Sequence, residues 1–212
     1  MSQNINHADI IGKEVVENLK KNNFDAHYFP ERAEAVKYIL SLIPEKATVG
    51  CGGSVTLKEL GICDLAKEKG AQILDHNVAG LTPEEKLIVR RQQLSCQVFL
   101  TSTNAITLDG VLVNMDGVGN RVGAMTFGPE KVIIVAGINK VCNDLNSAIE
   151  RIKFVAAPKN NLRLQTKNPC TLKGHCMDCQ GKSRICNVLS IMYKKPSVTD
   201  ISVILIGELL GY

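Results

Sequence analysis

The stretch that decides the fold is Val98–Lys140, VFLTSTNAITLDGVLVNMDGVGNRVGAMTFGPEKVIIVAGINK. It contains two apolar runs of the kind that form buried strands, Val98–Thr101 and Val132–Val135. Between them lie 30 residues rich in Gly, Asn, Asp and Thr, interrupted at intervals by apolar residues. Long irregular connections are usually functional or disordered, and the interspersed apolar residues argue against disorder. The stretch therefore predicts a structured crossover that faces a ligand.

The whole chain has the composition of an ordinary globular protein. Its 212 residues are 45% hydrophobic and 22% charged, with a formal net charge of +4. That length is enough to bury a core as one α/β domain. The sequence contains no run of about 18 apolar residues, so we expect no membrane span. It also lacks a basic segment followed by an apolar block at its N-terminus, so we expect no secretory signal. We expect a cytoplasmic protein.

Helical and strand-like patterns alternate along most of the chain. Apolar spacing predicts helices over 7–22, 33–43, 55–60, 62–69, 83–94 and 143–157, the last of them ended by Pro158. Strands are predicted at 24–29, 48–50, 72–74, 98–101, 132–135 and 201–206. This alternation predicts an α/β fold, a mostly parallel sheet with helices on both faces. Because residues 201–206 return to that sheet, we expect a single domain with an insertion at about 159–195.

A glycine-rich loop, Gly50-Cys51-Gly52-Gly53-Ser54, leads from a predicted strand into a predicted helix. Glycines let the backbone approach a ligand, and a helix N-terminus presents unpaired N–H groups to an anion. The loop could therefore bind a phosphate, a carboxylate or a nucleotide, or it could be a tight turn with Ser54 as the helix N-cap. Its spacing matches neither the P-loop nor the dinucleotide fingerprint, so no nucleotide cofactor is evident.

Polar residues also follow two other predicted strands, as Asp75-His76-Asn77 and Ser102-Thr103-Asn104. Open α/β sheets bind their ligands at the carboxyl ends of the strands, where the glycine-rich loop and both of these clusters lie. We therefore place Thr103 and Asn104 in a ligand groove. For His76 a plain loop position is the favoured interpretation and a site position is the alternative.

The segment Asp116-Gly117-Val118-Gly119-Asn120-Arg121 carries the groups best suited to chemistry. Asp116 could act as a general base if burial raised its pKa towards the working pH, and Arg121 offers a planar fork to a carboxylate or phosphate. We predict a catalytic role for Asp116. The predicted ligand-binding residues of this segment are Asp116, Gly117, Asn120 and Arg121. The alternative is a hairpin turn at Asp116-Gly117, which is our interpretation of Asp109-Gly110.

Four of the eight cysteines fall within 17 residues, namely Cys170, Cys176, Cys179 and Cys186. In a cytosolic chain this clustering favours a metal over disulfides, because thiolates are soft ligands that select zinc, iron–sulfur clusters or copper. An iron–sulfur cluster and zinc are the two metal interpretations, and His175 could replace one cysteine if the metal is zinc. Reduced or redox-active thiols are the third interpretation.

The remaining cysteines are scattered through apolar or mixed sequence. We expect Cys63, Cys96 and Cys142 to be single thiols that pack as small apolar side chains.

The region from Lys159 to Lys195 is basic, with eight Lys and Arg residues against one acidic residue, Asp178. This charge could offset a thiolate cluster or attract an acidic partner. Aromatic residues for base stacking are almost absent there, so nucleic acid is not a favoured partner.

Three segments resemble the LUD (lactate utilisation) family and its LutC/YkgG-like members. They are GCGGSVTLKELGI (50–62), the whole stretch 98–140 with its TNAIT, DG and GNRV patterns, and ILIGELLGY (204–212). The resemblance implies a fold similar to ribose-5-phosphate isomerase, glucosamine-6-phosphate deaminase and CoA transferases, the NagB/RpiA/CoA transferase-like fold. In that superfamily the loop corresponding to Gly50–Ser54 handles phosphate or CoA-like groups. It also implies a part in the oxidation of L-lactate to pyruvate, with iron–sulfur subunits as partners. This redox setting favours an iron–sulfur cluster on the four clustered cysteines, with zinc as the alternative.

Two functions from different classes follow. The first is an enzyme or catalytic subunit that binds a small anionic, phosphorylated or CoA-type metabolite in the groove. The second is a non-catalytic redox or assembly subunit, with an iron–sulfur or zinc site on Cys170–Cys186. The typical LutC-like proteins that the chain resembles lack this cysteine motif, so its role does not follow from the resemblance.

Overall fold

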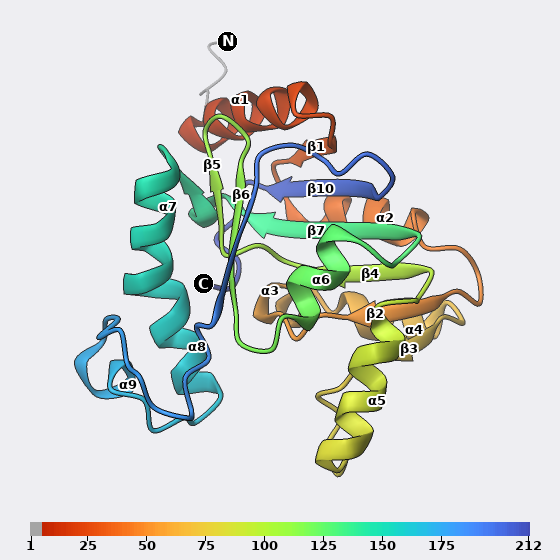
Figure 1. Cartoon of the computed structure of the whole chain (residues 1–212). Helices are drawn as coiled ribbons and strands as arrows, with labels where there is room; N and C mark the ends of the chain where they lie inside the picture. The colour runs from red at the N-terminus through yellow and green to blue at the C-terminus, as the bar shows by residue number, and fades with distance from the viewer. Residues whose placement is uncertain (1–5) are drawn as a thin grey trace.

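A computed structural model describes residues 6–212 and has a six-stranded parallel sheet at its centre (Figure 1). The strand order is β1-β10-β7-β4-β2-β3. The strands are β1 (Asp25–Phe29), β2 (Thr48–Cys51), β3 (Gln72–Leu74), β4 (Val98–Thr101), β7 (Lys131–Gly137) and β10 (Asp200–Ile206). All six predicted strands are therefore confirmed. The C-terminal strand β10 lies between β1 and β7, so the chain does return to the sheet.

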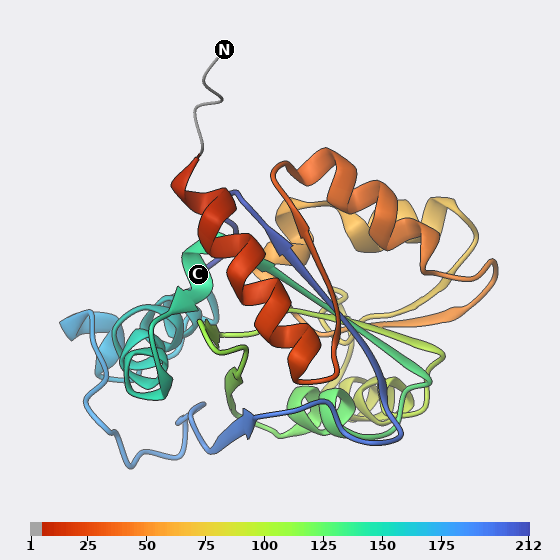
Figure 2. The same cartoon turned by 90° about the horizontal axis from the view of Figure 1, so that it is seen from above.

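Helices cover both faces of this sheet, as the sequence predicted (Figure 2). One face packs against α1 (His7–Lys21) and α6 (Asn120–Thr126), and the other against α2 (Arg32–Ser41), α3 (Val55–Glu59) and α4 (Ile62–Glu68). The central strand β7 sends Val132 and Ile134 to the first face and Ile133 and Val135 to the second. A strand buried on both faces reads as a continuous apolar run. Among residues 6–212, every helix is too short or too polar to span a bilayer.

The stretch between β4 and β7 forms part of a second, smaller sheet, which the sequence patterns did not predict. Its order is β8-β5-β6-β9, and its strands are β5 (Ala105–Thr107), β6 (Leu112–Asp116), β8 (Val141–Cys142) and β9 (Val188–Met192). The antiparallel pair β5–β6 turns through Asp109-Gly110, which confirms the hairpin interpretation of that dipeptide. Two of these strands have only two or three residues, too few to show a period in the sequence.

The helix that follows Asp144 continues past Pro158, so the prediction that Pro158 ends it is wrong. The helix α7 (Leu145–Arg151) leads into a π-helical turn, η2 (Ile152–Ala156), and then into α8 (Ala157–Arg163). Pro158 lies in the first turn of α8, and the wider π turn before it accommodates the missing N–H group. The extra helical turns bring α8 to the carboxyl ends of the central strands.

The basic region 159–195 contains regular secondary structure. It begins inside α8, contains the short helix α9 (Cys170–Lys173), and includes β9, which pairs with all five residues of β6. Figure 1 shows the cysteine segment in light blue beside α8. The pairing of β9 ties this segment to the second sheet.

The remaining helix, α5 (Pro83–Gln93), begins with the capping box that its sequence predicts. The Oγ1 atom of Thr82 accepts the N–H group of Glu85, and the Glu85 carboxylate accepts the N–H group of Thr82. This helix ends beside β2 and β3, where its side chains reach the carboxyl ends of both strands.

Gly110 is the point where the β5–β6 hairpin meets α1. Its φ is +80°, and an ideal Cβ would lie 2.8 Å from the backbone nitrogen of Leu19. We expect Gly110→Ala to lower the free energy of unfolding by about 3 kcal/mol, because backbone strain and a clash with a helix backbone act together. Urea denaturation measures this loss.

Gly70→Ala is the matched control for that substitution. Gly70 also has a positive φ, +93°, but no atom lies within 4 Å of its ideal Cβ. Only the conformational cost of about 1 to 2 kcal/mol should therefore appear. Equal losses in the two variants would contradict the clash with α1.

Candidate functional site

A pocket of about 320 Å³ lies at the carboxyl ends of the central strands, where the sequence predicted a groove. The loops after β2, β3 and β4 contribute Gly52–Thr56, His76–Asn77 and Ser102–Asn104. Other walls come from the end of β6, from α5 and α8, and from the 3-10 turn η1 (Ile138–Lys140) that follows β7. All three polar clusters predicted from the sequence therefore meet in one place.

Nine of the ten predicted ligand-binding residues line this pocket, and their contact with a ligand stays a prediction. The exception is Gly50, which lies inside β2. An ideal Cβ at Gly50 would lie 2.9 Å from the ring of Phe99 and 3.0 Å from the Sγ atom of Cys96. The structure therefore assigns Gly50 to the packing of the core rather than to the pocket.

Ser54 combines both roles that the sequence suggested for it. Its Oγ atom accepts the N–H group of Leu57 at 3.3 Å, which confirms the N-cap interpretation, and the residue also lines the pocket. Gly53 has a φ of +51°, and an ideal Cβ added to it would lie 3.3 Å from the side-chain nitrogen of Asn77. The loops after β2 and β3 therefore form one continuous wall.

Arg121 is the most connected side chain of the pocket. Its Nε atom pairs with Asp116 Oδ2 at 3.3 Å, its Nη1 atom donates to Ser102 O (3.1 Å) and Asn114 Oδ1 (2.6 Å), and its Nη2 atom donates to Asn104 Oδ1 (3.2 Å) and Met115 O (2.9 Å). The four Nη N–H groups of the guanidinium thus have hydrogen-bond acceptors in the protein, and its Nε atom faces the Asp116 carboxylate. Arg121 joins the loop after β4 to β6 and α6, and it has no N–H group left for an anion. The predicted role as anion partner is therefore not the one its geometry favours.

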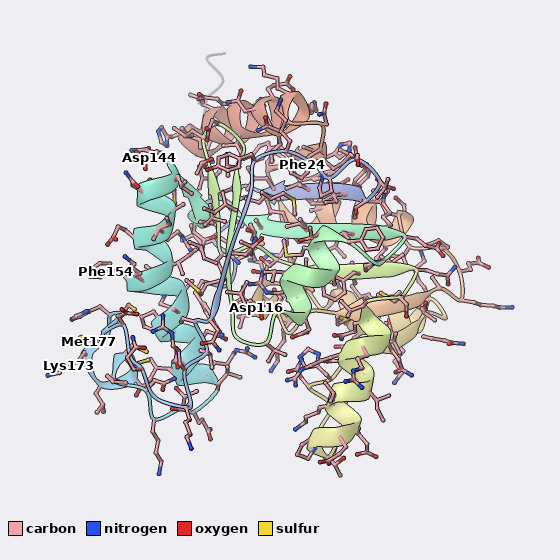
Figure 3. The ribbon with its side chains drawn as sticks, in the orientation of Figure 1. Phe24, Asp116, Asp144, Phe154, Lys173 and Met177 are labelled. Atoms are coloured by element: carbon pink, nitrogen blue, oxygen red, sulfur yellow. A yellow bond between two sulfur atoms is a disulfide. The ribbon has the colours of Figure 1, made fainter. Side chains whose placement is uncertain are left out.

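Asp116, labelled in Figure 3, lies at the end of β6 and is 8% exposed. Its Oδ1 atom accepts the backbone N–H groups of Val118 (3.0 Å) and Gly119 (2.8 Å), and its Oδ2 atom faces Arg121. The geometry gives Asp116 a positioning role at the turn into α6, and its catalytic role stays a prediction.

Lys140 is a pocket residue that the sequence analysis missed. It is 3% exposed, and its Nζ atom donates to Ser102 Oγ (2.8 Å), Thr56 Oγ1 (3.0 Å) and Thr103 O (3.2 Å). Within residues 6–212 no carboxylate forms an ion pair with it. Burial, together with the nearby charges of Arg151 and Arg121, lowers the pKa of Lys140 to about 7. The feature of the sequence that could have identified Lys140 is its position just past the carboxyl end of a predicted buried strand.

Arg90, on α5, is a pocket cation that pairs with no other residue in the described part of the chain. Its Nε atom is buried and makes no hydrogen bond to any described residue. Arg163 differs, since it donates to Asn160 Oδ1 at 2.8 Å and to the Tyr212 hydroxyl at 3.0 Å. His76 lines the same wall, so the site alternative for that residue has the better geometry. Burial and the charge of Arg90 lower the pKa of His76.

The pocket carries excess positive charge. Its cationic lining residues are Arg90, Arg121, Lys140 and Arg163. Among the lining residues that the structure describes, Asp116 is the one carboxylate, and Arg121 already pairs with it. This arrangement is suited to binding an anion, because the remaining cations have no acidic counterpart.

Two of the scattered cysteines form a disulfide, which contradicts the prediction that Cys63 is a single thiol. Cys51, at the end of β2, pairs with Cys63 of α4, with their Cα atoms 6.8 Å apart. The fold brings these residues together by packing α4 beside β2, and no spacing rule shows that contact. Cys96 and Cys142 are free, as predicted, the first buried and the second half-buried.

The four clustered cysteines meet around a second cavity of only about 20 Å³. All four are free thiols, one buried and three half-buried: Cys170, Cys176, Cys179 and Cys186. His175 does not line this cavity. It stacks on Phe154 with ring centroids 5.7 Å apart, and its Nδ1 atom lies 3.1 Å from Cys176 O. The geometry therefore gives no support to His175 as a replacement ligand.

Comparisons with known proteins agree with this architecture. A family model described as the LUD domain matches residues 12–206. The chain is similar to a DUF162 family protein from Deinococcus radiodurans, with a TM-score of 0.54, 12% identity, and coverage of 95% of this chain and 99% of that one. At this identity the likeness shows a shared fold. No curated protein matches the chain.

Two further similarities are partial. Ribose 5-phosphate isomerase from Plasmodium falciparum has a TM-score of 0.32 and 18% identity, over 53% of this chain and 52% of that one. The protein eIF2B delta from Chaetomium thermophilum has a TM-score of 0.37 and 15% identity, over 66% of this chain and 54% of that one.

Proposed function

This chain belongs to the LUD domain family, and from that premise we propose that its pocket binds a small anionic metabolite as part of L-lactate utilisation. The observation that carries the proposal is the excess positive charge of the pocket, centred on the unpartnered Arg90. The buried Nε–H group of Arg90 makes no hydrogen bond to a described residue, and a buried donor without a partner costs free energy. A bound carboxylate or phosphate would supply that partner.

The pocket volume limits the size of the ligand. Ligand pockets usually measure about 300 to 1,000 Å³, so 320 Å³ lies at the small end of the range. A three-carbon acid such as lactate or pyruvate fits such a volume, and so does a small sugar phosphate. A CoA-type metabolite would place only one end inside. We therefore favour a small carboxylate or phosphate over an acyl-CoA.

Lys140 supplies a group for chemistry on that ligand. An amine with a pKa of about 7 is partly unprotonated near neutral pH. It can then take a proton from a substrate, or add to a carbonyl carbon as a nucleophile. Asp116 accepts two backbone N–H groups and faces Arg121. In the proposed function Lys140 is the candidate general base, and Asp116 shapes the wall.

Binding of anions to variants of α5 tests this proposal. We expect Arg90→Gln to weaken the binding of inorganic phosphate, L-lactate or pyruvate by about 10- to 100-fold, because a hydrogen bond to a charged group contributes roughly 1.5 to 3 kcal/mol. Isothermal titration calorimetry with each of these anions measures the dissociation constant of wild type and variant.

Arg91→Gln is the matched control, since Arg91 is the next residue, carries the same charge and is exposed. It should bind these anions as the wild type does. Equal weakening in both variants would mean that the anion responds to the overall charge of α5 rather than to the pocket. Wild-type protein that binds none of the three anions would refute the proposed site.

A second candidate function is a non-catalytic redox or assembly subunit that works with iron–sulfur subunits of a lactate-oxidising complex. The meeting of four free cysteines around one cavity favours it. An iron–sulfur cluster on these cysteines would support electron transfer, whereas a redox-inactive ion would leave only the assembly role. The identity of the metal therefore separates the two.

A further inference from the structure

We propose that Cys170, Cys176, Cys179 and Cys186 bind a single zinc ion, which holds one wall of the anion pocket in place. The zinc site depends only on the cysteine cavity and on the residues around it. The consequence for anion binding rests on the proposed function, and the experiment below separates the two.

The size of the cavity favours one ion over a cluster. Its volume of about 20 Å³ is close to the space that one water molecule needs, and a cluster of several irons and sulfides is larger. Four thiolates in a tetrahedron, each about 2.3 Å from the metal, form a common structural zinc site. Within residues 6–212 no three metal-binding side chains already meet as ligands, so an ion would draw the sulfurs inward from the cavity wall. Zinc is therefore favoured over the iron–sulfur cluster that the family resemblance put first.

The backbone around the cysteines is held by polar contacts. Asn168 is 3% exposed, and its Nδ2 atom donates to Asn161 Oδ1 (2.7 Å) and Ser183 O (2.8 Å), while Ser183 Oγ donates to Asn168 Oδ1 (2.7 Å). The N–H group of Cys176 donates to Lys153 O at 2.9 Å, which fixes the cysteine loop to the π turn η2. Such outer contacts orient ligands before a metal binds.

The charges around the cavity suit a zinc tetrathiolate, whose net charge is −2. Arg184 donates from Nε to Cys186 O (2.8 Å) and from Nη1 to Cys179 O (2.7 Å), so its guanidinium joins the two cysteine turns. Its Nη1 atom also pairs with Asp178 Oδ1 at 2.8 Å. The N–H group of Asp178 points at Cys176 Sγ from 3.4 Å. A cation and a backbone dipole next to the sulfurs both stabilise thiolates.

Ile185 connects this cavity to the anion pocket. It lies between Arg184 and Cys186 and lines both cavities. An ideal Cβ at Gly117 would lie 3.2 Å from the carbonyl oxygen of Ile185, so the two backbones are in close contact. Asn187 continues this contact, donating from its backbone to Asp116 O (2.9 Å) and from its side chain to Gly117 O (2.9 Å). An ion that fixes Cys186 therefore fixes the wall beside Asp116.

Metal analysis of the full-length protein tests the site. We expect about one zinc per chain in wild-type protein purified under reducing conditions, and cobalt substituted for zinc should give the visible absorption of a tetrahedral cobalt–thiolate centre. Cys179→Ser should lose the zinc, and Cys142→Ser should keep it. Cys142 is the matched control, a half-buried free thiol outside the motif. Circular dichroism checks that both variants fold.

The outcomes are distinct for each part of the proposal. Iron with inorganic sulfide would overturn zinc in favour of a cluster. Folded wild-type protein that neither contains nor takes up zinc or cobalt would overturn the site. If chelation removes the zinc, we expect phosphate to bind at least about 10-fold more weakly, in line with the loss of an ordering contact. Unchanged phosphate binding would overturn the proposal that the ion holds the pocket wall in place, but not the zinc site itself. Failure of native protein to bind phosphate would refute the anion pocket alone.

Discussion

Arg121→Ala is expected to lower the free energy of unfolding by about 3 to 5 kcal/mol. The side chain is 16% exposed, and it makes four hydrogen bonds to oxygen atoms of the protein and an ion pair with Asp116. Its removal leaves the carboxylate of Asp116 buried without its cation, the condition under which broken buried pairs cost most. It also removes the donors of Asn104 and Asn114, which cross the pocket wall. Urea denaturation of wild type and variant measures the difference.

Arg32→Ala is the control for the loss of an arginine ion pair as such. Arg32 pairs with Glu208 at the surface, where the two side chains are 47% and 31% exposed, so about 0 to 1 kcal/mol should be lost. Arg121→Lys retains the charge, but a lysine has three donors in place of a planar fork of five. It should recover only part of the stability. If Arg121→Ala costs no more than Arg32→Ala, the network at Arg121 does not hold the pocket together.

Lys140→Met is expected to make the protein more stable at pH 6 and to change how stability depends on pH. The pKa of Lys140 is about 7 in the folded state, and it is about 10.4 in an unfolded chain. Below pH 7 the amine is protonated in both states, and the folded state bears the full cost of a buried charge. Between pH 7 and about 10.4 the unfolded state binds more protons, so wild-type stability rises with pH. The methionine variant lacks this rise.

The expected rise is on the order of several kcal/mol, and urea denaturation between pH 6 and pH 10 measures it. The free thiols Cys96 and Cys142 act in the opposite direction, because burial raises the pKa of each. They are present in both proteins, so the difference between wild type and Lys140→Met isolates the lysine. A difference that does not vary with pH would show that Lys140 has an ordinary pKa. Stability gained with loss of function is typical of a site residue.

Local patterns in the sequence were enough for the central architecture. The apolar run of β7 and the short runs of β2 and β4 identify strands that are buried on both faces, because each can be read from neighbouring residues. The capping box at Thr82 and the N-cap at Ser54 are also local, since they join residues three apart. The position of the pocket followed from a general rule, because the polar ends of parallel strands share one edge of the sheet.

Contacts between distant segments had to come from the tertiary structure. The sequence shows that Arg121 is a cation, but its acceptors lie on the loop after β4 and on β6, so only the fold reveals that they satisfy it. Arg90 has the opposite outcome, since nothing in α5 marks it as the cation that is left without a partner. The disulfide between Cys51 and Cys63 and the passage of the helix through Pro158 likewise depend on packing rather than on spacing.

By itself the sequence determined the strands of the central sheet and most of the helices around it, the edge of the sheet that carries the pocket, and the resemblance to the LUD family. Only the tertiary structure decided which charges are satisfied, that Lys140 is buried beside three oxygen atoms, and that Ile185 joins the cysteine cavity to the pocket. The physical reason is the separation along the chain of the residues that interact. Strand and helix patterns arise from residues a few positions apart, whereas the charge and shape of a site arise from side chains that meet only when distant segments pack.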